Sequence, residues 1–107
     1  MFNTPDSCPH LYEIREVTPS ADGCEDCLRI GDTWVHLRLC MHCGHVGCCD
    51  NSKNKHATRH FHATGHPIIK SFEPGEDWGW CYIDQLYFER LPINAGLYHH
   101  QSIYPSP

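Results

Sequence analysis

Two Cys-x-x-Cys pairs, Cys24/Cys27 and Cys40/Cys43, constrain the fold of this chain more than any other feature. Two residues between thiolates let both sulfurs face one tetrahedral zinc ion, at Zn–S distances of about 2.3 Å. A single pair would also suit a thioredoxin-like redox motif, but that motif needs a βαβ context and a lone pair. The sequence has neither, so the two pairs predict metal binding.

Further potential ligands follow the second pair. Cys48 comes first, and His56 and His60 then stand four residues apart on a predicted helix, where both side chains project from one face. His66 follows Gly65, which is expected to end that helix. Spacing leaves two arrangements open. Both Cys pairs could share one ion, or each pair could bind its own ion together with two of the downstream residues.

A third potential set joins the two ends of the folded region. Cys8 and His10 lie near the start, and Cys81 and Asp84 lie near the end. Asp84 occupies the offset where a second cysteine would complete the site, and a carboxylate oxygen binds zinc at about 2.0–2.2 Å. The alternative is an exposed acid and an incomplete set. The sequence therefore predicts two or three zinc ions, with no role for Cys49.

The length of the chain makes such ligands important. A chain of 107 residues buries only about 60–65% of its unfolded surface, and small domains commonly add disulfides or metal. Disulfides require an oxidising compartment, but the sequence begins MFNTPDSCPH, without the features of a secretory signal. No stretch approaches the roughly 20 apolar residues of a membrane span. We therefore expect metal-bound thiols, a cytoplasmic localisation and no membrane association.

The net charge and the residue pattern give expectations for nucleic-acid binding, oligomeric state and domain bounds. The net charge of −5 argues against nucleic-acid binding, which needs a basic face. We expect a monomer with short tails at 1–7 and 91–107, the latter irregular or disordered, around a domain at 8–90.

Apolar alternation within this domain predicts strands at residues 33–39, 67–72 and 80–88. A helix is predicted at 52–64, with Ser52 as its N-cap. The expected fold class is α+β, a small antiparallel sheet with one principal helix and loops held by metal.

The order Cys-Pro-His, Cys-x-x-Cys, Trp, Cys-x-x-Cys-x4-Cys, His-x3-His-x5-His-Pro and Trp-Cys-Tyr resembles the UBP-type zinc finger. That family is the ubiquitin-binding module of ubiquitin-specific proteases and of a cytoplasmic histone deacetylase. The resemblance covers Cys8 to about Phe88 and implies interleaved ligands, that is, cross-braced zinc sites in a UBP-type zinc-finger fold. It implies site one as Cys24, Cys27, Cys48 and His56; site two as Cys40, Cys43, His60 and His66; and site three as Cys8, His10 and Cys81, with Asp84 in place of the family's usual cysteine.

The resemblance also implies capture of a free C-terminal Gly-Gly tail in a deep pocket. Trp80, Tyr82 and Tyr87 match pocket positions, although each also fits a structural role. The family's Gly-Arg-Tyr after the central Cys is Cys49-Asp50-Asn51 here, and Asp50 would repel a carboxylate. These departures predict a recognition module for a peptide C-terminus or partner protein that binds canonical ubiquitin poorly.

Two other functions fit the sequence less well. One is a structural zinc domain or adaptor that binds no terminal carboxylate. The other is a zinc hydrolase, because His56 and His60 have the spacing of the H-E-x-x-H motif. Ala57 replaces the glutamate that would act as general base, and the cysteines fill the coordination shell. We therefore expect the chain not to be an enzyme.

Overall fold

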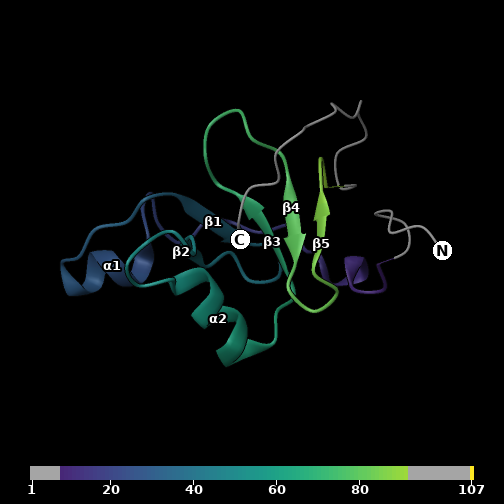
Figure 1. Ribbon diagram of the computed structural model, residues 1–107, viewed down its shortest axis with the longest axis horizontal. Helices are drawn as coiled ribbons and strands as arrows, with labels where there is room; N and C mark the ends of the chain where they lie inside the picture. Colours follow the sequence, from purple (N-terminus) through teal and green to yellow (C-terminus); the bar gives the residue numbers. More distant parts are fainter. Residues whose placement is uncertain (1–7, 92–106) are drawn as a thin grey trace.

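The computed structural model describes residues 8–91 and residue 107. A 5-stranded antiparallel sheet in the order β2-β1-β3-β4-β5 forms its centre (Figure 1). The strands are β1 (Leu37–Cys40), β2 (Val46–Cys48), β3 (Ile68–Ser71), β4 (Gly79–Cys81) and β5 (Leu86–Phe88). The helices are the short 3-10 helix η2 (Leu11–Glu13), α1 (Glu25–Ile30) and α2 (His56–Thr64). The predicted α+β class is confirmed, and no helix among the described residues is long and apolar enough to cross a membrane.

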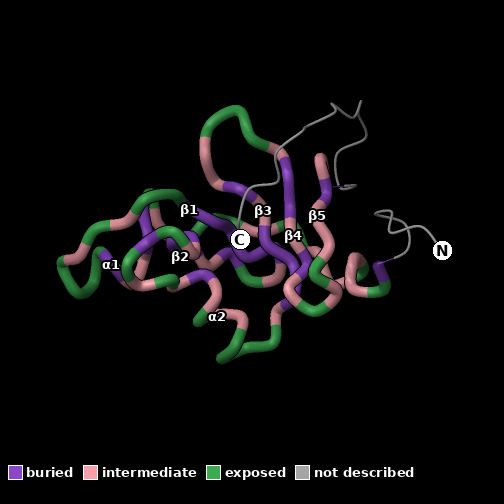
Figure 2. The backbone as a smooth tube through the Cα atoms, in the orientation of Figure 1, coloured by how far each residue is buried: buried purple, intermediate pink, exposed green. Residues whose placement is uncertain are grey.

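The two faces of the sheet have different neighbours. One face carries the buried core, which includes Leu39, Ile68 and Phe88 and which packs against side chains of the N-terminal segment. The buried stretches of the strands are purple in Figure 2. The opposite face lies under α2. A Cβ atom added to Gly47 of β2 would lie 2.6 Å from the backbone nitrogen of Ala57 in α2. Glycine therefore lets the helix pack directly on the strand, which places helical histidines beside strand cysteines.

Three predicted boundaries were wrong, and local hydrogen bonds explain the first two. The strand expected at 33–39 begins only at Leu37, because the Val35 N–H donates to the Ser52 hydroxyl instead of to a neighbouring strand. Ser52 is consequently buried and does not cap α2. The helix begins at His56, whose N–H donates to Cys48 Sγ at 3.2 Å, and it ends before Gly65 as predicted.

The strand predicted at 80–88 is instead a hairpin of β4 and β5. Gln85 has a left-handed backbone (φ 54°), which reverses the chain and brings Asp84 back towards Cys81. Sequence patterning also missed α1 and β2, both of which are short. Helix α1 begins where Cys24 Sγ accepts the Cys27 N–H.

The described part of the chain continues to Leu91, which is buried and whose N–H donates to the Asp77 carbonyl at 3.3 Å. The tail predicted at 1–7, and residues 92–106 of the tail predicted at 91–107, lie outside the described residues. Residue 107 is described, and it lies against the loop that follows β2, because the Asp50 N–H donates to the Pro107 carbonyl oxygen at 2.8 Å.

Candidate metal centres

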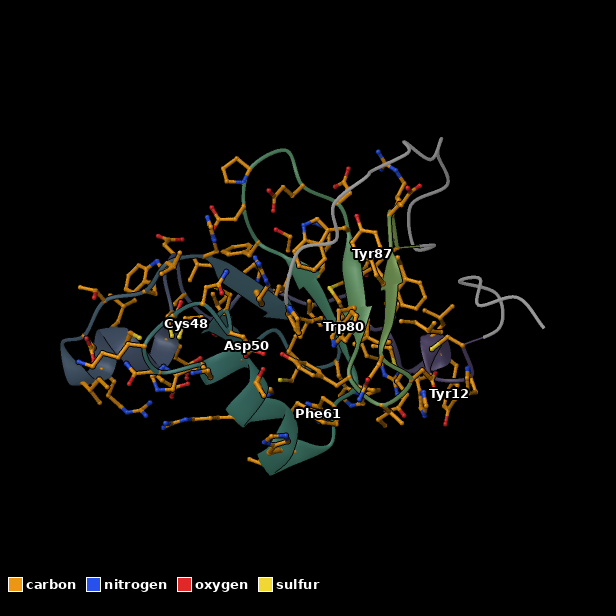
Figure 3. The ribbon with its side chains drawn as sticks, in the orientation of Figure 1. Tyr12, Cys48, Asp50, Phe61, Trp80 and Tyr87 are labelled. Carbon is orange, nitrogen blue, oxygen red and sulfur yellow. The ribbon has the colours of Figure 1, made fainter. Side chains whose placement is uncertain are left out.

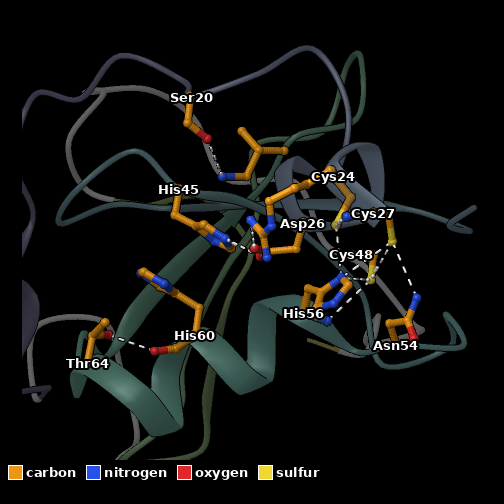
Figure 4. A network of polar contacts seen from close by, with 12 residues as sticks. Ser20, Cys24, Asp26, Cys27, His45, Cys48, Asn54, His56, His60 and Thr64 are labelled. Carbon is orange, nitrogen blue, oxygen red and sulfur yellow. Dashed lines mark hydrogen bonds and ion pairs between the residues drawn. The ribbon is translucent and has the colours of Figure 1, made fainter. Parts of the chain in front are cut away.

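The first cluster lies between α1, the end of β2 and the start of α2 (Figure 4). The imidazole nitrogen Nδ1 of His56 lies 3.3 Å from Cys24 Sγ, 3.4 Å from Cys27 Sγ and 3.7 Å from Cys48 Sγ. The sulfurs of Cys27 and Cys48 are 4.0 Å apart. Backbone N–H groups of Cys27 and His56 and the side-chain amide of Asn54 donate to these sulfurs. Such donors stabilise thiolates.

The second cluster lies between the loop after β1 and the far end of α2. Cys40 Sγ is 3.6 Å from His66 Nδ1, and Cys43 Sγ is 3.3 Å from His60 Nε2. The four ligand atoms lie within 4.8 Å of one another. His56 and His60, which sequence spacing placed on one helix face, therefore belong to different clusters.

The distances in these two clusters suit zinc. A tetrahedral ion with Zn–S of about 2.3 Å and Zn–N of about 2.0–2.1 Å separates a sulfur and a nitrogen by roughly 3.5 Å and two sulfurs by roughly 3.8 Å. The separations in the two clusters, from 3.3 to 4.0 Å, bracket these values. Thiol and imidazole are also the donor set that zinc prefers.

Burial shifts the pKa values of the thiol and imidazole ligands in opposite directions. It raises the pKa of Cys24 to about 12 and that of Cys40 to about 11, so these thiols keep their protons unless a cation replaces them. Coordination to zinc removes such a proton outright. Burial, with His45 and His66 nearby, lowers the pKa of His60 to about 4, and it also lowers the pKa of His56. Both imidazoles are therefore neutral at pH 7 and can donate a lone pair to a metal.

The third cluster brings Cys8, His10, Cys81 and Asp84 within 4.8 Å of one another. Cys81 Sγ lies 3.6 Å from His10 Nδ1, which fits a shared metal. Asp84 Oδ2, however, lies only 2.9 Å from both Cys8 Sγ and His10 Nδ1. These are hydrogen-bond distances, shorter than the roughly 3.4–3.6 Å expected between zinc ligands. The donors suit zinc, but the carboxylate also binds its neighbours directly.

The sequence did not predict three residues that position the histidine ligands: His45, Asp26 and His42. The His45 ring stacks on the His60 ring, with centroids 4.1 Å apart, and His45 Nε2 lies 2.7 Å from Asp26 Oδ2. The His42 ring stacks on His66 in the same way, at 4.1 Å. Each of these contacts joins residues distant in the sequence, so spacing gave no signal for them.

The predicted pocket residues lie in two places. Trp80 and Tyr87 are opposite each other on β4 and β5 and are half-buried (Figure 3). Tyr82 follows β4 and stacks on Phe61 of α2, with centroids 4.6 Å apart. Trp34 is partly buried and packs against the core.

Comparisons with known proteins converge on one family. The family model described as "Zn-finger in ubiquitin-hydrolases and other protein" matches residues 24–92. The NAD-dependent deacetylase sir2A of Dictyostelium discoideum is 36% identical over 70 residues, which cover 65% of this chain. Ubiquitin carboxyl-terminal hydrolase 44 of Xenopus tropicalis is 30% identical over 84 residues, or 73% of this chain. The matched region is 12% of the length of each relative.

A solved structure matches over nearly the whole length. The solution NMR structure of protein RPA1320 from Rhodopseudomonas palustris has a TM-score of 0.74 and 57% sequence identity to this chain. The match covers 94% of this chain and 95% of the NMR chain. The similarity therefore includes the zinc-finger region and extends beyond it.

Proposed function

The chain belongs to the family of zinc fingers found in ubiquitin hydrolases and other proteins, and from this premise we propose a zinc-stabilised module that recognises the C-terminal end of a peptide. Domains of this family are protein-interaction modules. The proposed ligands are those of the three clusters. They are Cys24, Cys27, Cys48 and His56; Cys40, Cys43, His60 and His66; and Cys8, His10, Cys81 and Asp84.

The observation that carries the zinc assignment is the convergence of these ligand atoms, each set within 4.8 Å. When bound, zinc supplies cross-links rather than chemistry. Site one ties α1 to β2 and α2, site two ties β1 to α2, and site three ties the N-terminal segment to the β4–β5 hairpin. A chain of this size gains much of its stability from such cross-links.

Four protein ligands at each site favour recognition over catalysis. A catalytic zinc keeps one coordination position open for water, whereas each cluster here offers four donors. The His56 and His60 pair cannot form the metal site of an H-E-x-x-H hydrolase, because the two rings belong to different clusters. The proposed module is therefore not an enzyme.

Terminal recognition is supported by the face of the sheet that holds Trp80 and Tyr87. Half-buried aromatic side chains suit a slender peptide end, and a terminal carboxylate needs a positive charge or N–H donors nearby. Arg38 supplies positive charge on this side of the sheet, since its guanidinium lies 4.6 Å from the ring centre of Trp78, which is itself 5.9 Å from the Tyr87 ring. The Asp50 N–H offers a backbone donor at the end of β2.

A peptide titration tests the proposal. The zinc-loaded chain is titrated with a fluorescent peptide ending in Gly-Gly with a free carboxylate, and with its C-terminally amidated form. Loss of a charged hydrogen bond of about 1.5–3 kcal/mol should weaken binding of the amidated peptide roughly 10- to 100-fold. Trp80→Ala should weaken binding of the free-carboxylate peptide, whereas Tyr12→Ala, an exposed aromatic away from this face, should not.

Equal binding of both peptides, or binding of neither, would leave the structural zinc domain as the better description. Unchanged affinity in Trp80→Ala, with binding otherwise selective for the free carboxylate, would place the site elsewhere on the molecule.

A further inference from the structure

The backbone N–H of Asp50 has a partner from the far end of the chain. It donates to the carbonyl oxygen of Pro107, the last residue of the sequence, at 2.8 Å. Pro107 is half-buried, and the C-terminal mark in Figure 1 lies over the sheet beside β1, β2 and β3. The contact therefore brings the end of the sequence onto the domain itself.

The side chain of Asp50 has a partner of its own on α2. The Thr58 hydroxyl of α2 donates to the Asp50 carboxylate and lies 3.2 Å from the Tyr82 hydroxyl. Tyr82 is in turn held against Phe61. The Asp50 carboxylate is thus engaged by a donor on the helix, while its N–H is directed to Pro107. This arrangement reduces the repulsion that the sequence alone predicts between Asp50 and a terminal carboxylate.

Arg38 adds favourable charge to the same neighbourhood. Burial raises the pKa of Tyr82, the Asp50 carboxylate raises it further, and the positive charge of Arg38 opposes both effects. Arg38 and Asp50 therefore act in opposite directions on the pKa of the same side chain. The positive charge of the guanidinium favours a carbonyl dipole or a carboxylate in this part of the molecule.

We propose that the Pro107 segment occupies the peptide-binding site at the Asp50 N–H, so that an external peptide must displace it. The inference rests on the proposed function, because it names an occupant for the same site. A segment tethered to its own site competes at a high effective concentration. The apparent dissociation constant for an external peptide is the intrinsic constant divided by the fraction of molecules whose site is open.

The test compares the full chain with two variants. One lacks residues 104–107, and the other keeps the full length but replaces Tyr-Pro-Ser-Pro with Gly-Ser-Gly-Ser. Zinc content and the dispersion of the amide NMR spectrum establish that each variant is folded. In both variants the Asp50 amide resonance should shift, and the Gly-Gly carboxylate peptide should bind about tenfold more tightly than to the full chain.

A peptide with the sequence of residues 102–107 is then added to the truncated chain. It should return the Asp50 resonance towards its position in the full chain, and its amidated form should do so less well. A folded truncated chain that binds neither this peptide nor the Gly-Gly peptide would overturn the proposed function. Selective Gly-Gly binding of equal strength in the full and truncated chains, with an unshifted Asp50 resonance, would overturn self-occupancy alone.

The Asp50 resonance of the full chain should not change with protein concentration. A concentration-dependent shift would mean that one copy takes the terminus of another, and the intramolecular proposal would be wrong.

Discussion

The three ligand clusters fall into two kinds, and the difference lies in the fourth ligand. In the two clusters built only from Cys and His, the ligand separations of 3.3–4.0 Å are those of atoms arranged around a zinc ion. In the third cluster Asp84 lies 2.9 Å from both Cys8 and His10. Thiols form only weak hydrogen bonds with one another. A carboxylate forms strong ones. The hydrogen bonds of Asp84 therefore stabilise the third cluster by themselves, and a zinc ion bound there would have to replace them.

The clusters also differ in what they join. Sites one and two share α2, which contributes His56 to one and His60 to the other, so neither can be lost without loosening the same helix. Site three connects the N-terminal Cys8 and His10 to the β4–β5 hairpin at the edge of the sheet. The comparison predicts a fold that depends on sites one and two and is only adjusted by site three.

The largest effect is expected from Cys48→Ser, matched by Cys49→Ser at the next position. Both sulfurs are fully buried, but only Cys48 belongs to a cluster. Binding of a structural zinc contributes about 10–16 kcal/mol to folding in small zinc fingers, so Cys48→Ser should abolish the cooperative thermal transition seen by circular dichroism. Cys49→Ser should cost about 1 kcal/mol, the typical effect of a conservative buried change. Chelation of zinc should reproduce the Cys48 result, and a dispersed native NMR spectrum after chelation would contradict it.

Acidification should produce the next largest effect, again through the two Cys/His clusters. The folded pKa of His60 is about 4, whereas an unfolded histidine titrates at about 6.5. Between these pH values the unfolded chain binds a proton that the folded chain does not. The free energy of unfolding therefore falls as the pH drops from about 6.5 to about 4. Protons also compete with zinc for the ligands, and this competition likewise lowers the free energy of unfolding as the pH drops.

Zinc release measured with a chromophoric indicator should follow this fall in stability. His62→Ala, which removes an exposed histidine of the same helix, should leave the pH profile unchanged. Stability that stays constant from pH 7 to pH 4 would contradict the assignment of His60 as a buried neutral ligand.

Asp84→Ala should have a smaller and more local effect. It should reduce the zinc content of the purified protein from three ions to two, as measured by native mass spectrometry, while the spectrum of α2 and β1 stays native. Asp77→Ala, which removes another hairpin-side carboxylate from outside the clusters, is the control and should retain three ions. Asp84→Cys should bind the third ion more tightly than the parent chain, because a thiolate replaces a carboxylate that is engaged by its neighbours. Three ions in Asp84→Ala would remove Asp84 from the site.

The residues of the ligand clusters could be predicted from the sequence. The tertiary contacts and turns that position them could not. Spacing within Cys-x-x-Cys acts over a few residues, and the resemblance selected the interleaved grouping that the structure places together. The start of α2 was wrong because a sulfur of β2, rather than Ser52, receives its first N–H. The predicted third strand was wrong because a left-handed Gln85 turns it into a hairpin. These features depend on tertiary contacts and on one backbone conformation that hydrophobic alternation does not encode.

The smallest predicted effect tests a contact that spacing could not reveal. His45→Ala removes the ring that stacks on His60 and the partner of Asp26, whereas His45→Phe keeps an aromatic ring and loses only the polar contact. Residues that support metal ligands typically change metal affinity by 10- to 100-fold when they are replaced. His45 contacts the zinc ligand His60 by stacking alone. We therefore expect the zinc affinity of site two to fall about tenfold in His45→Ala and less in His45→Phe. Competition with a chromophoric chelator measures both, and equal losses would show that the Asp26 contact, rather than stacking, positions His60.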